Sequence, residues 1–321
     1  MYDVFGLVLP FFGLIFLGFV VARITRQPLE ALGWMNTFII YVALPALFFQ
    51  LLSKTPIEQL TEWGYILGAV AATYIVFTVM FVASVLTDRD IASATIKGLA
   101  SAYGNIGYMG PGLALLSFGE AAAVPVALIF CFENIIHFAV APMMMALAGG
   151  DKTPPLTLAL DVIKKIVLHP FIIATAVGVA AAAMHFSAPV PLERLLDTLA
   201  RAAAPCALFA MGVTLALRPL RRVPTELGYI AALKLIVHPI ICYLMLSAVG
   251  DFDPVWVYAA VLLAALPTAT NVFVIAQQYG VWVERASASI LITTVLSVAT
   301  VTGLLYLIKS GLLPPDLFPG G

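Results

Sequence analysis

Long apolar runs follow one another along the whole chain. Each of ten runs holds about 20 mostly apolar residues, the length that a helix needs to cross a bilayer, and charged residues or turns rich in Pro, Gly and Asp separate it from the next. Continuous runs favour helices over barrel strands, whose apolar positions alternate. The predicted spans are 4–22, 34–52, 64–87, 92–118, 121–148, 166–186, 199–217, 225–249, 255–279 and 286–309. The pattern predicts an all-α integral membrane protein with ten transmembrane helices.

The composition agrees with this picture and excludes other classes of protein. Of 321 residues, 62% are hydrophobic and 10% are charged, whereas soluble domains carry about 25% charged residues. Because the apolar excess covers the whole chain, no separate soluble catalytic domain is expected. The net charge of −1 argues against a nucleic-acid partner. The three cysteines, Cys131, Cys206 and Cys242, lie inside apolar runs and do not suggest a disulfide framework.

The basic residues predict how the chain is oriented. Lys and Arg accumulate in short cytoplasmic loops, and ten of the 16 lie in loops that follow odd-numbered spans. Both termini are therefore expected outside the cytoplasm, with the chain in the cytoplasmic (inner) membrane and 151–165 as a cytoplasmic loop. The ten are Arg23, Arg26, Arg89, Lys152, Lys164, Lys165, Arg218, Arg221, Arg222 and Arg285, and the opposite side holds Lys54, Arg194, Arg201 and Lys309.

The two halves of the chain repeat weakly. A motif at 8–11 returns at 167–171, and the segment 43–49 returns 160 positions later at 203–209, each with a proline inside an apolar run. Five spans per half is an odd number, so the second half must be upside down relative to the first. We expect a first five-helix repeat at 1–150 and an inverted repeat at 166–321, an arrangement typical of secondary transporters.

Spans 4 and 9 are interrupted at corresponding places. Span 4 has four glycines and a proline within 104–112, and span 9 has Pro-Thr-Ala-Thr-Asn at 267–271. Unwound backbone at membrane depth is tolerated where it is buried in protein or lines a wet cavity, and the starts of half-helices suit anions. The alternative is that Gly and Pro serve packing alone. The predicted substrate-binding residues are Asn105, Ile106, Gly107, Gly110, Pro111, Pro267, Thr268, Thr270 and Asn271.

These motifs resemble the auxin efflux carrier family over essentially the whole chain. The resemblance rests on Leu44-Pro45-Ala46, on Asn105 with Met109-Gly110-Pro111, on Ala265-Leu266-Pro267 and on the segment 271–280. It implies a scaffold of spans 1, 2, 6 and 7, a moving transport unit of spans 3–5 and 8–10, and a crossover of the broken helices that holds a carboxylate. It also implies an elevator motion and homodimers formed through spans 2 and 7. Relatives of the same fold, the bile-acid symporters, use sodium.

The chain departs from the plant carriers after the crossover. Val272 stands where they place a proline, and Gln277-Gln278 replaces a basic–acidic pair. The substrate therefore stays open between an auxin-like anion and a small dicarboxylate of the malonate type found among bacterial relatives.

A few ionisable residues lie inside the predicted spans, where they are costly and usually functional. Glu133, Asn134 and His137 share span 5, and Lys234 and His238 share span 8. A contact between Glu133 and Lys234 is expected. Either Glu133 and His137 carry a coupling proton, or Glu133 and Lys234 form a static buried pair, with a hydrogen-bonded histidine, that orders the helices. Lys97 and His169 are expected at the membrane interface.

The sequence favours a carrier over other classes of protein. It contains no His-Glu-x-x-His, Gly-x-Ser-x-Gly or paired acidic motif, so we predict neither an enzyme nor a metal or cofactor site. The prediction is a secondary transporter for a small carboxylate. A channel or receptor-like module of the same fold remains the alternative, and coupling to protons or to sodium stays open.

Overall fold

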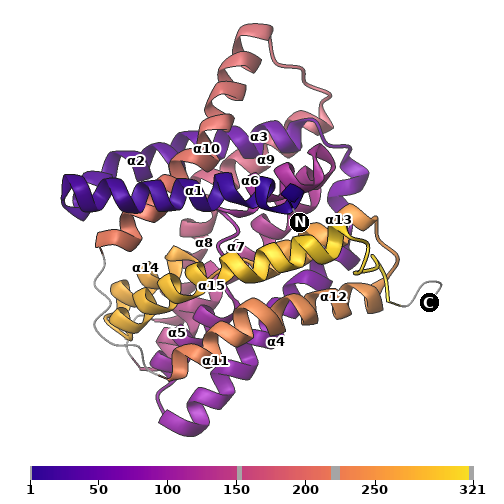
Figure 1. Cartoon of the computed structure of the whole chain (residues 1–321). Coiled ribbons are helices and arrows are strands. Elements are labelled where there is room, and N and C mark those ends of the chain that lie inside the picture. Colours follow the sequence, from indigo (N-terminus) through magenta and orange to yellow (C-terminus); the bar gives the residue numbers. More distant parts are fainter. Residues whose placement is uncertain (1, 150–153, 218–224, 318–321) are drawn as a thin grey trace.

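The computed structural model describes residues 2–149, 154–217 and 225–317, and its regular elements are helices (Figure 1). The α-helices are α1 (Tyr2–Thr25), α2 (Gly33–Phe38), α3 (Leu44–Ser53), α4 (Trp63–Asp88), α5 (Ile91–Ala102), α6 (Gly110–Phe118), α7 (Ala123–Leu147), α8 (Pro155–Val167), α9 (Pro170–Ala183), α10 (Val190–Leu217), α11 (Glu226–Ala232), α12 (His238–Val249), α13 (Pro254–Ala265), α14 (Thr270–Tyr279) and α15 (Val283–Lys309). Short 3-10 helices cover Leu29–Leu32, Ile57–Thr61 and Glu120–Ala122. Two π-helical turns, Ile39–Ala43 and Leu233–Val237, lie inside longer helices.

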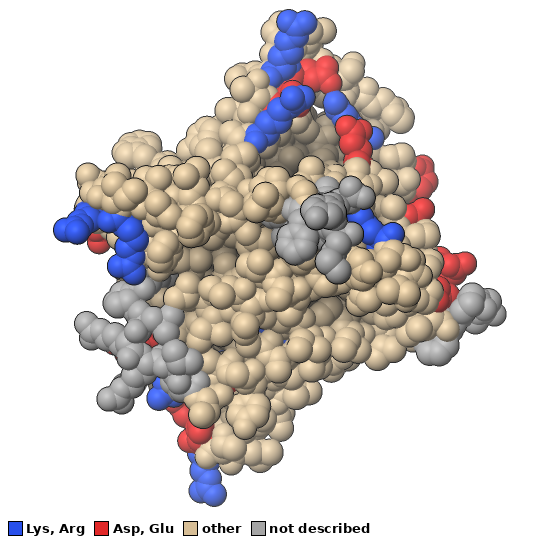
Figure 2. Space-filling view, viewed as in Figure 1, with Lys and Arg blue, Asp and Glu red and all other residues tan. Residues whose placement is uncertain are grey.

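Six helical stretches among the described residues are long and apolar enough to cross a membrane. They are Leu29–Ser53, Trp63–Asp88, Glu120–Leu147, Val190–Leu217, Glu226–Val249 and Val283–Lys309. Shorter apolar helices cover Leu9–Thr25, Ile172–Ala183 and Pro254–Ala265. Charged side chains gather at opposite ends of the molecule, and a broad uncharged surface lies between them (Figure 2). The all-helical, membrane-integral prediction is confirmed at this level.

The interruptions predicted in spans 4 and 9 are present. The first lies between the end of α5 at Ala102 and the start of α6 at Gly110, and the second between Ala265 and Thr270. Leu266 and Ala269 adopt extended conformations. The glycines and prolines therefore end the helices where the sequence indicated.

The expected cytoplasmic loop at 151–165 is wrong in part, because α8 occupies Pro155–Val167. Leu156, Leu160 and Ile163 recur there at helical spacing among polar residues, a pattern that supports an amphipathic helix rather than a loop. The sixth span is also not one helix, since α8 and α9 are separated by Leu168 and His169. Residues 151–153 of the expected loop lie outside the described residues.

The helices form two groups. One group contains α1, α3, α9 and α10, which pack on one another (Figure 1). The other group contains α4, α5 and the five helices from α11 through α15. In the first group α1 and α10 approach closely, since a Cβ atom added at Gly18 or Gly212 would strike the backbone of the other helix. Small residues permit such contacts in membrane helices. The interrupted segments lie in the second group and face the first.

Candidate functional site

The two interrupted segments cross each other and pair through their backbones. The Asn105 N–H donates to the Pro267 carbonyl oxygen at 2.8 Å, and the Ala269 N–H donates to the Tyr103 carbonyl oxygen at 2.9 Å. These bonds flank an antiparallel bridge between Gly104 and Thr268. The pairing satisfies backbone groups that would be costly to leave unbonded at membrane depth. We call the segments 103–109 and 266–271 together the crossover.

Gly104 is needed for this crossing. A Cβ atom at Gly104 would lie 3.1 Å from the Leu263 carbonyl oxygen and 3.3 Å from Nζ of Lys234. Both distances are tighter than ordinary van der Waals contact, so a side chain would push the two segments apart. The glycines predicted from the sequence thus let two backbones and a lysine meet in one place.

A small cavity of about 80 Å³ lies against the crossover. Its wall on the crossover side contains Asn105, Gly107, Thr270 and Asn271, which the sequence predicted as substrate-binding residues, and Asn134 of α7. The sequence did not predict the other lining residues, which are Ile40, Leu44, Tyr103, Gly104, Tyr108, Phe130, Phe138, His169 and Ala269. The start of α14 at Thr270 is part of this wall. The cavity therefore combines amide side chains with a helix N-terminus.

His169, which the sequence places at the membrane interface, lies at the break between α8 and α9. It lines the cavity, because the break between α8 and α9 turns its backbone into an extended conformation. The sequence could not show this, since a histidine before a proline is equally compatible with the end of a span.

Five of the predicted substrate-binding residues do not line the cavity: Ile106, Gly110, Pro111, Pro267 and Thr268. Their contacts are structural. The Thr268 hydroxyl donates to the Ala100 carbonyl oxygen at 2.7 Å, and its N–H donates to Oγ1 of Thr293 at 3.1 Å. A Cβ atom at Gly110 would lie 2.7 Å from the Leu263 side chain. These residues build the crossover around the cavity.

Polar side chains of the cavity wall form a connected chain. Nδ2 of Asn271 donates to the Tyr103 hydroxyl at 2.8 Å, and that hydroxyl donates to Oδ1 of Asn134 at 2.5 Å. Asn134 in turn donates to the Phe130 carbonyl oxygen at 2.7 Å. Tyr103 joins the two asparagines, and the sequence missed it because an aromatic residue in an apolar run is usually a core residue.

Asn105 keeps its amide group available. Its Nδ2 atom contacts Sδ of Met211 at 3.2 Å, and a thioether is a weak acceptor. A carboxylate oxygen would be a better partner for this donor. Among the cavity amides, Asn105 would therefore gain the largest improvement in hydrogen bonding when an anion binds.

The ionisable residues of spans 5 and 8 lie behind the crossover. Glu133 and Lys234 are both buried, and among the described residues they form no direct ion pair. The expected contact is replaced by a relay through two other buried side chains. Nζ of Lys234 lies 3.0 Å from Nδ1 of His238, Nε2 of His238 lies 3.0 Å from Oγ1 of Thr73, and Thr73 donates to Oε1 of Glu133 at 2.6 Å.

The relay has one consistent hydrogen-bond direction. An ammonium group only donates, so Nδ1 of His238 accepts and Nε2 carries the hydrogen that it donates to Thr73. Lys234 also donates to the Ala264 carbonyl oxygen at 2.5 Å, in the last turn of α13 before the crossover. The relay therefore connects a buried carboxylate to the backbone of α13 just before the crossover. The sequence missed Thr73, because a lone hydroxyl in an apolar span gives no periodic signal.

His137 is buried next to the cavity chain rather than in the relay. Its ring stacks on Tyr103 with centroids 3.8 Å apart, and its Nδ1 atom lies 2.8 Å from the Tyr74 hydroxyl. Although Glu133 and His137 are one helical turn apart, they contact different partners. His137 thus supports Tyr103.

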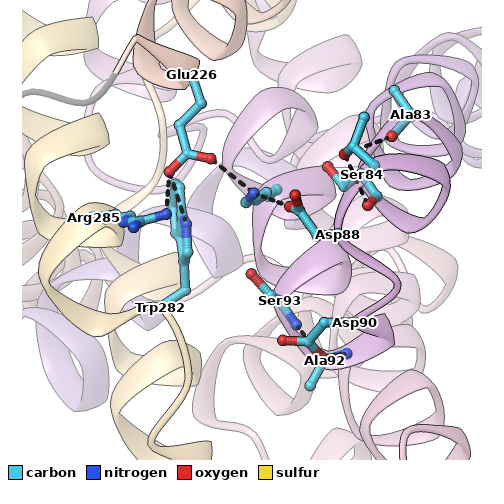
Figure 3. Close-up of polar contacts among 11 residues, drawn as sticks. Ala83, Ser84, Asp88, Asp90, Ala92, Ser93, Glu226, Trp282 and Arg285 are labelled. Atoms are coloured by element: carbon cyan, nitrogen blue, oxygen red, sulfur yellow. Dashed lines mark hydrogen bonds and ion pairs between the residues drawn. The ribbon is translucent and has the colours of Figure 1, made fainter.

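Lys97, the other residue that the sequence places at the interface, is buried and paired. It is 5% exposed, and its Nζ atom lies 2.6 Å from Asp88 and 2.7 Å from Glu226. Glu226 also accepts from Arg285 at 2.6 Å and from the Trp282 indole at 3.3 Å (Figure 3). These pairs join the end of α4 and the middle of α5 to the starts of α11 and α15. We call Lys97, Asp88, Glu226 and Arg285 the ion cluster.

Comparisons with known proteins identify the family. Residues 3–305 match a family model described as "Membrane transport protein". A protein of Rhizobium meliloti (strain 1021) named "Putative malonate transporter" is 65% identical over 320 residues, which cover 99% of this chain and 100% of that protein. Both matches extend through the interrupted spans and the cavity residues. The chain belongs to the membrane transport protein family, of the auxin efflux carrier type that its motifs resemble, and it is an integral membrane transporter rather than an enzyme.

Proposed function

We propose that this transporter carries a small organic carboxylate, such as a malonate-type dicarboxylate, and binds it in the crossover cavity. The observation that carries the proposal is the convergence of Asn105, Asn271 and the start of α14 on one cavity. The name of the relative from Rhizobium meliloti supports the same substrate class. A cavity of about 80 Å³ suits an anion of a few carbon atoms better than one that carries an indole ring.

The cavity binds an anion with dipoles and neutral donors. The lining residues that the structure describes include no Lys, Arg, Asp or Glu. A hydrogen bond to a charged group contributes about 1.5–3 kcal/mol, and a helix N-terminus adds roughly 0.3–1 kcal/mol, or up to about 2 kcal/mol in a partly buried geometry. Such a site binds moderately and releases its substrate, as a carrier requires.

We also propose that ten spans form two inverted halves. In this arrangement α4 to α7 correspond to α11 to α15, and each set contains one interrupted span. The group of α1, α3, α9 and α10 corresponds to the scaffold of spans 1, 2, 6 and 7, and the other group to the transport unit. The close contact between α1 and α10 supports a rigid scaffold against which an elevator motion can occur.

Membrane placement and assembly complete the proposal. The protein lies in the cytoplasmic membrane with both termini outside the cytoplasm, on the basis of the loop charges. It forms a homodimer through spans 2 and 7. Large apolar side chains exposed on span 2, such as Trp34 and Tyr41, are compatible with that interface.

We propose that the relay from Lys234 to Glu133 couples transport to protons. A change of protonation at Glu133 would alter the hydrogen bonds that reach Ala264 and thus the crossover. The same relay could instead be a static structural element. If uptake depends on sodium and not on a pH gradient, the proton proposal is wrong.

Counterflow in proteoliposomes tests the proposed substrate site. Wild-type protein should exchange radiolabelled malonate across the membrane with saturation, and Asn105→Ala and Asn271→Ala should each lower the apparent affinity about tenfold or more. Asn36→Ala, which changes an amide outside the cavity, is the matched control. Unchanged affinity in both cavity variants would contradict the site, and non-saturating flux without counterflow would indicate a channel.

A further inference from the structure

The interruption between α8 and α9 has no counterpart in the first span. Pro10 lies inside the continuous helix α1, whereas Pro170 starts α9 after a break at Leu168 and His169. Proline removes a backbone donor and favours an extended residue before it. Because α1 accommodates its proline without breaking, the proline alone does not account for the interruption. The distinct feature of the second site is the histidine.

The break places this histidine on the wall of the cavity. His169 lines the same cavity as Asn105 and Asn271, and it belongs to the helix group that packs against the interrupted spans. Its ring lies against Phe138, with centroids 5.1 Å apart and planes inclined by 31°. The imidazole is therefore held against α7 at the cavity wall.

The crossover alone does not supply hydrogen-bond partners for both carboxylates of a dicarboxylate. Its two carboxylates are a few bonds apart, and a buried carboxylate without a partner is costly. Asn271 and Asn134 are already engaged with Tyr103. Among the lining residues that the structure describes, His169 is the one that carries an imidazole. An imidazole N–H donates to a carboxylate while it is neutral.

We propose that His169 determines specificity by donating a hydrogen bond to the second carboxylate of a dicarboxylate whose first carboxylate is held at the crossover. This inference rests on the proposed function, because it assumes that the crossover cavity binds the anion. It divides the site into a carboxylate-binding part on the interrupted spans and a selecting residue on the opposite helix group. A monocarboxylate would use the first part alone.

Binding of malonate and propionate to purified protein tests the inference. The two anions have three carbons each and differ in the second carboxylate. In the wild type malonate should bind more tightly than propionate. His169→Leu should weaken malonate binding about 10- to 100-fold, as expected for the loss of a hydrogen bond to a charged group, and should change propionate binding less than about threefold. His169→Asn, which keeps an N–H donor, should recover part of the preference for malonate.

The controls separate the two proposals. His185→Leu, which changes an exposed histidine outside the cavity, should leave both affinities unchanged. If wild-type protein binds neither anion, the proposed function fails. If it binds malonate, and His169→Leu keeps the wild-type ratio of malonate affinity to propionate affinity, the role of His169 is overturned while the function stands. If Tyr108→Phe abolishes the preference for malonate over propionate and His169→Leu does not, the residue that determines specificity is Tyr108 instead.

A measurement on unaltered protein covers the case in which His169→Leu does not fold. With ¹⁵N-labelled histidine, malonate should shift the ring nitrogen signals of His169 and propionate should not. Malonate binding that leaves these signals unchanged would overturn the inference.

Discussion

Replacing Lys97 by Met should destabilise the protein much more than the same change at an exposed lysine. Lys97 is 5% exposed, and its ammonium group lies within 2.7 Å of Glu226 and 2.6 Å of Asp88. Methionine keeps much of the apolar length of the side chain but removes the charge. The two carboxylates would then face each other across an apolar gap.

The burial of Asp88 and Glu226, the partners of Lys97, sets the size of the loss in unfolding free energy. Removing one member of a fully buried pair costs about 3–5 kcal/mol, whereas an exposed pair contributes about 0–1 kcal/mol. The side chains of Asp88 and Glu226 are 43% and 21% exposed, so water can partly solvate them after the change. Glu226 also keeps Arg285 at 2.6 Å. We therefore expect Lys97→Met to lower the free energy of unfolding by about 2–3 kcal/mol, between these limits.

Denaturant unfolding in detergent micelles measures this loss, and Lys54→Met is the matched control. Nζ of Lys54 lies 2.8 Å from Glu193, but the two side chains are 67% and 49% exposed. The hydrogen bond that Lys54 donates to Glu193 raises the pKa of Lys54, so the lysine is charged at neutral pH. Despite the similar distance, Lys54→Met should cost at most about 1 kcal/mol.

Equal losses in the two variants would refute the argument from burial. A second check uses Glu226→Gln in combination with Lys97→Met. If the charges interact as the distances indicate, the combined loss should be smaller than the sum of the single losses by about 0.5–3 kcal/mol. Strict additivity would show that the ion cluster does not act as a unit.

Two further predictions concern the relay and the packing of α1 on α10. Thr73→Val removes the hydroxyl between His238 and Glu133. It should reduce malonate uptake driven by a pH gradient more than it reduces malonate counterflow in the absence of a pH gradient. Equal effects on both assays would argue for a static relay. Gly212→Ala places a Cβ atom against the Ile15 carbonyl oxygen and should lower the free energy of unfolding by about 1–3 kcal/mol. Gly228→Ala, the control, has open space around the added atom and should not lower it. Similar stability of the two variants would contradict the close contact.

The interrupted spans could be predicted because their sequence signals are local. Four glycines and a proline within 104–112, and Pro267 ahead of Asn271, cannot continue a helix without exposing backbone groups. The positions of Asn105 and Asn271 on one cavity followed from the expectation that two such breaks meet. The length and apolar character of the other spans were equally evident, because they depend on composition within a short window.

The residues that were missed depend on packing between distant segments. Thr73 and Tyr103 are ordinary members of apolar spans, and their roles arise from hydrogen bonds to Glu133, Asn134 and Asn271. The partners of Lys97 were missed because the sequence shows the depth of this residue in a span but not the carboxylates of other helices. The start of α10 at Val190 was missed because a hydropathy pattern reveals the apolar part of a helix and not its charged extension.

The bound anion is the most direct test of the account, because its position in the protein can be determined. A structure of the protein in a lipid nanodisc with malonate, compared with one without it, should show additional density in the cavity between Asn105, Asn271 and His169. One carboxylate should lie at the crossover and the other near the His169 ring. Malonate bound elsewhere, with the cavity unchanged, would contradict the central claim that the crossover is the substrate site.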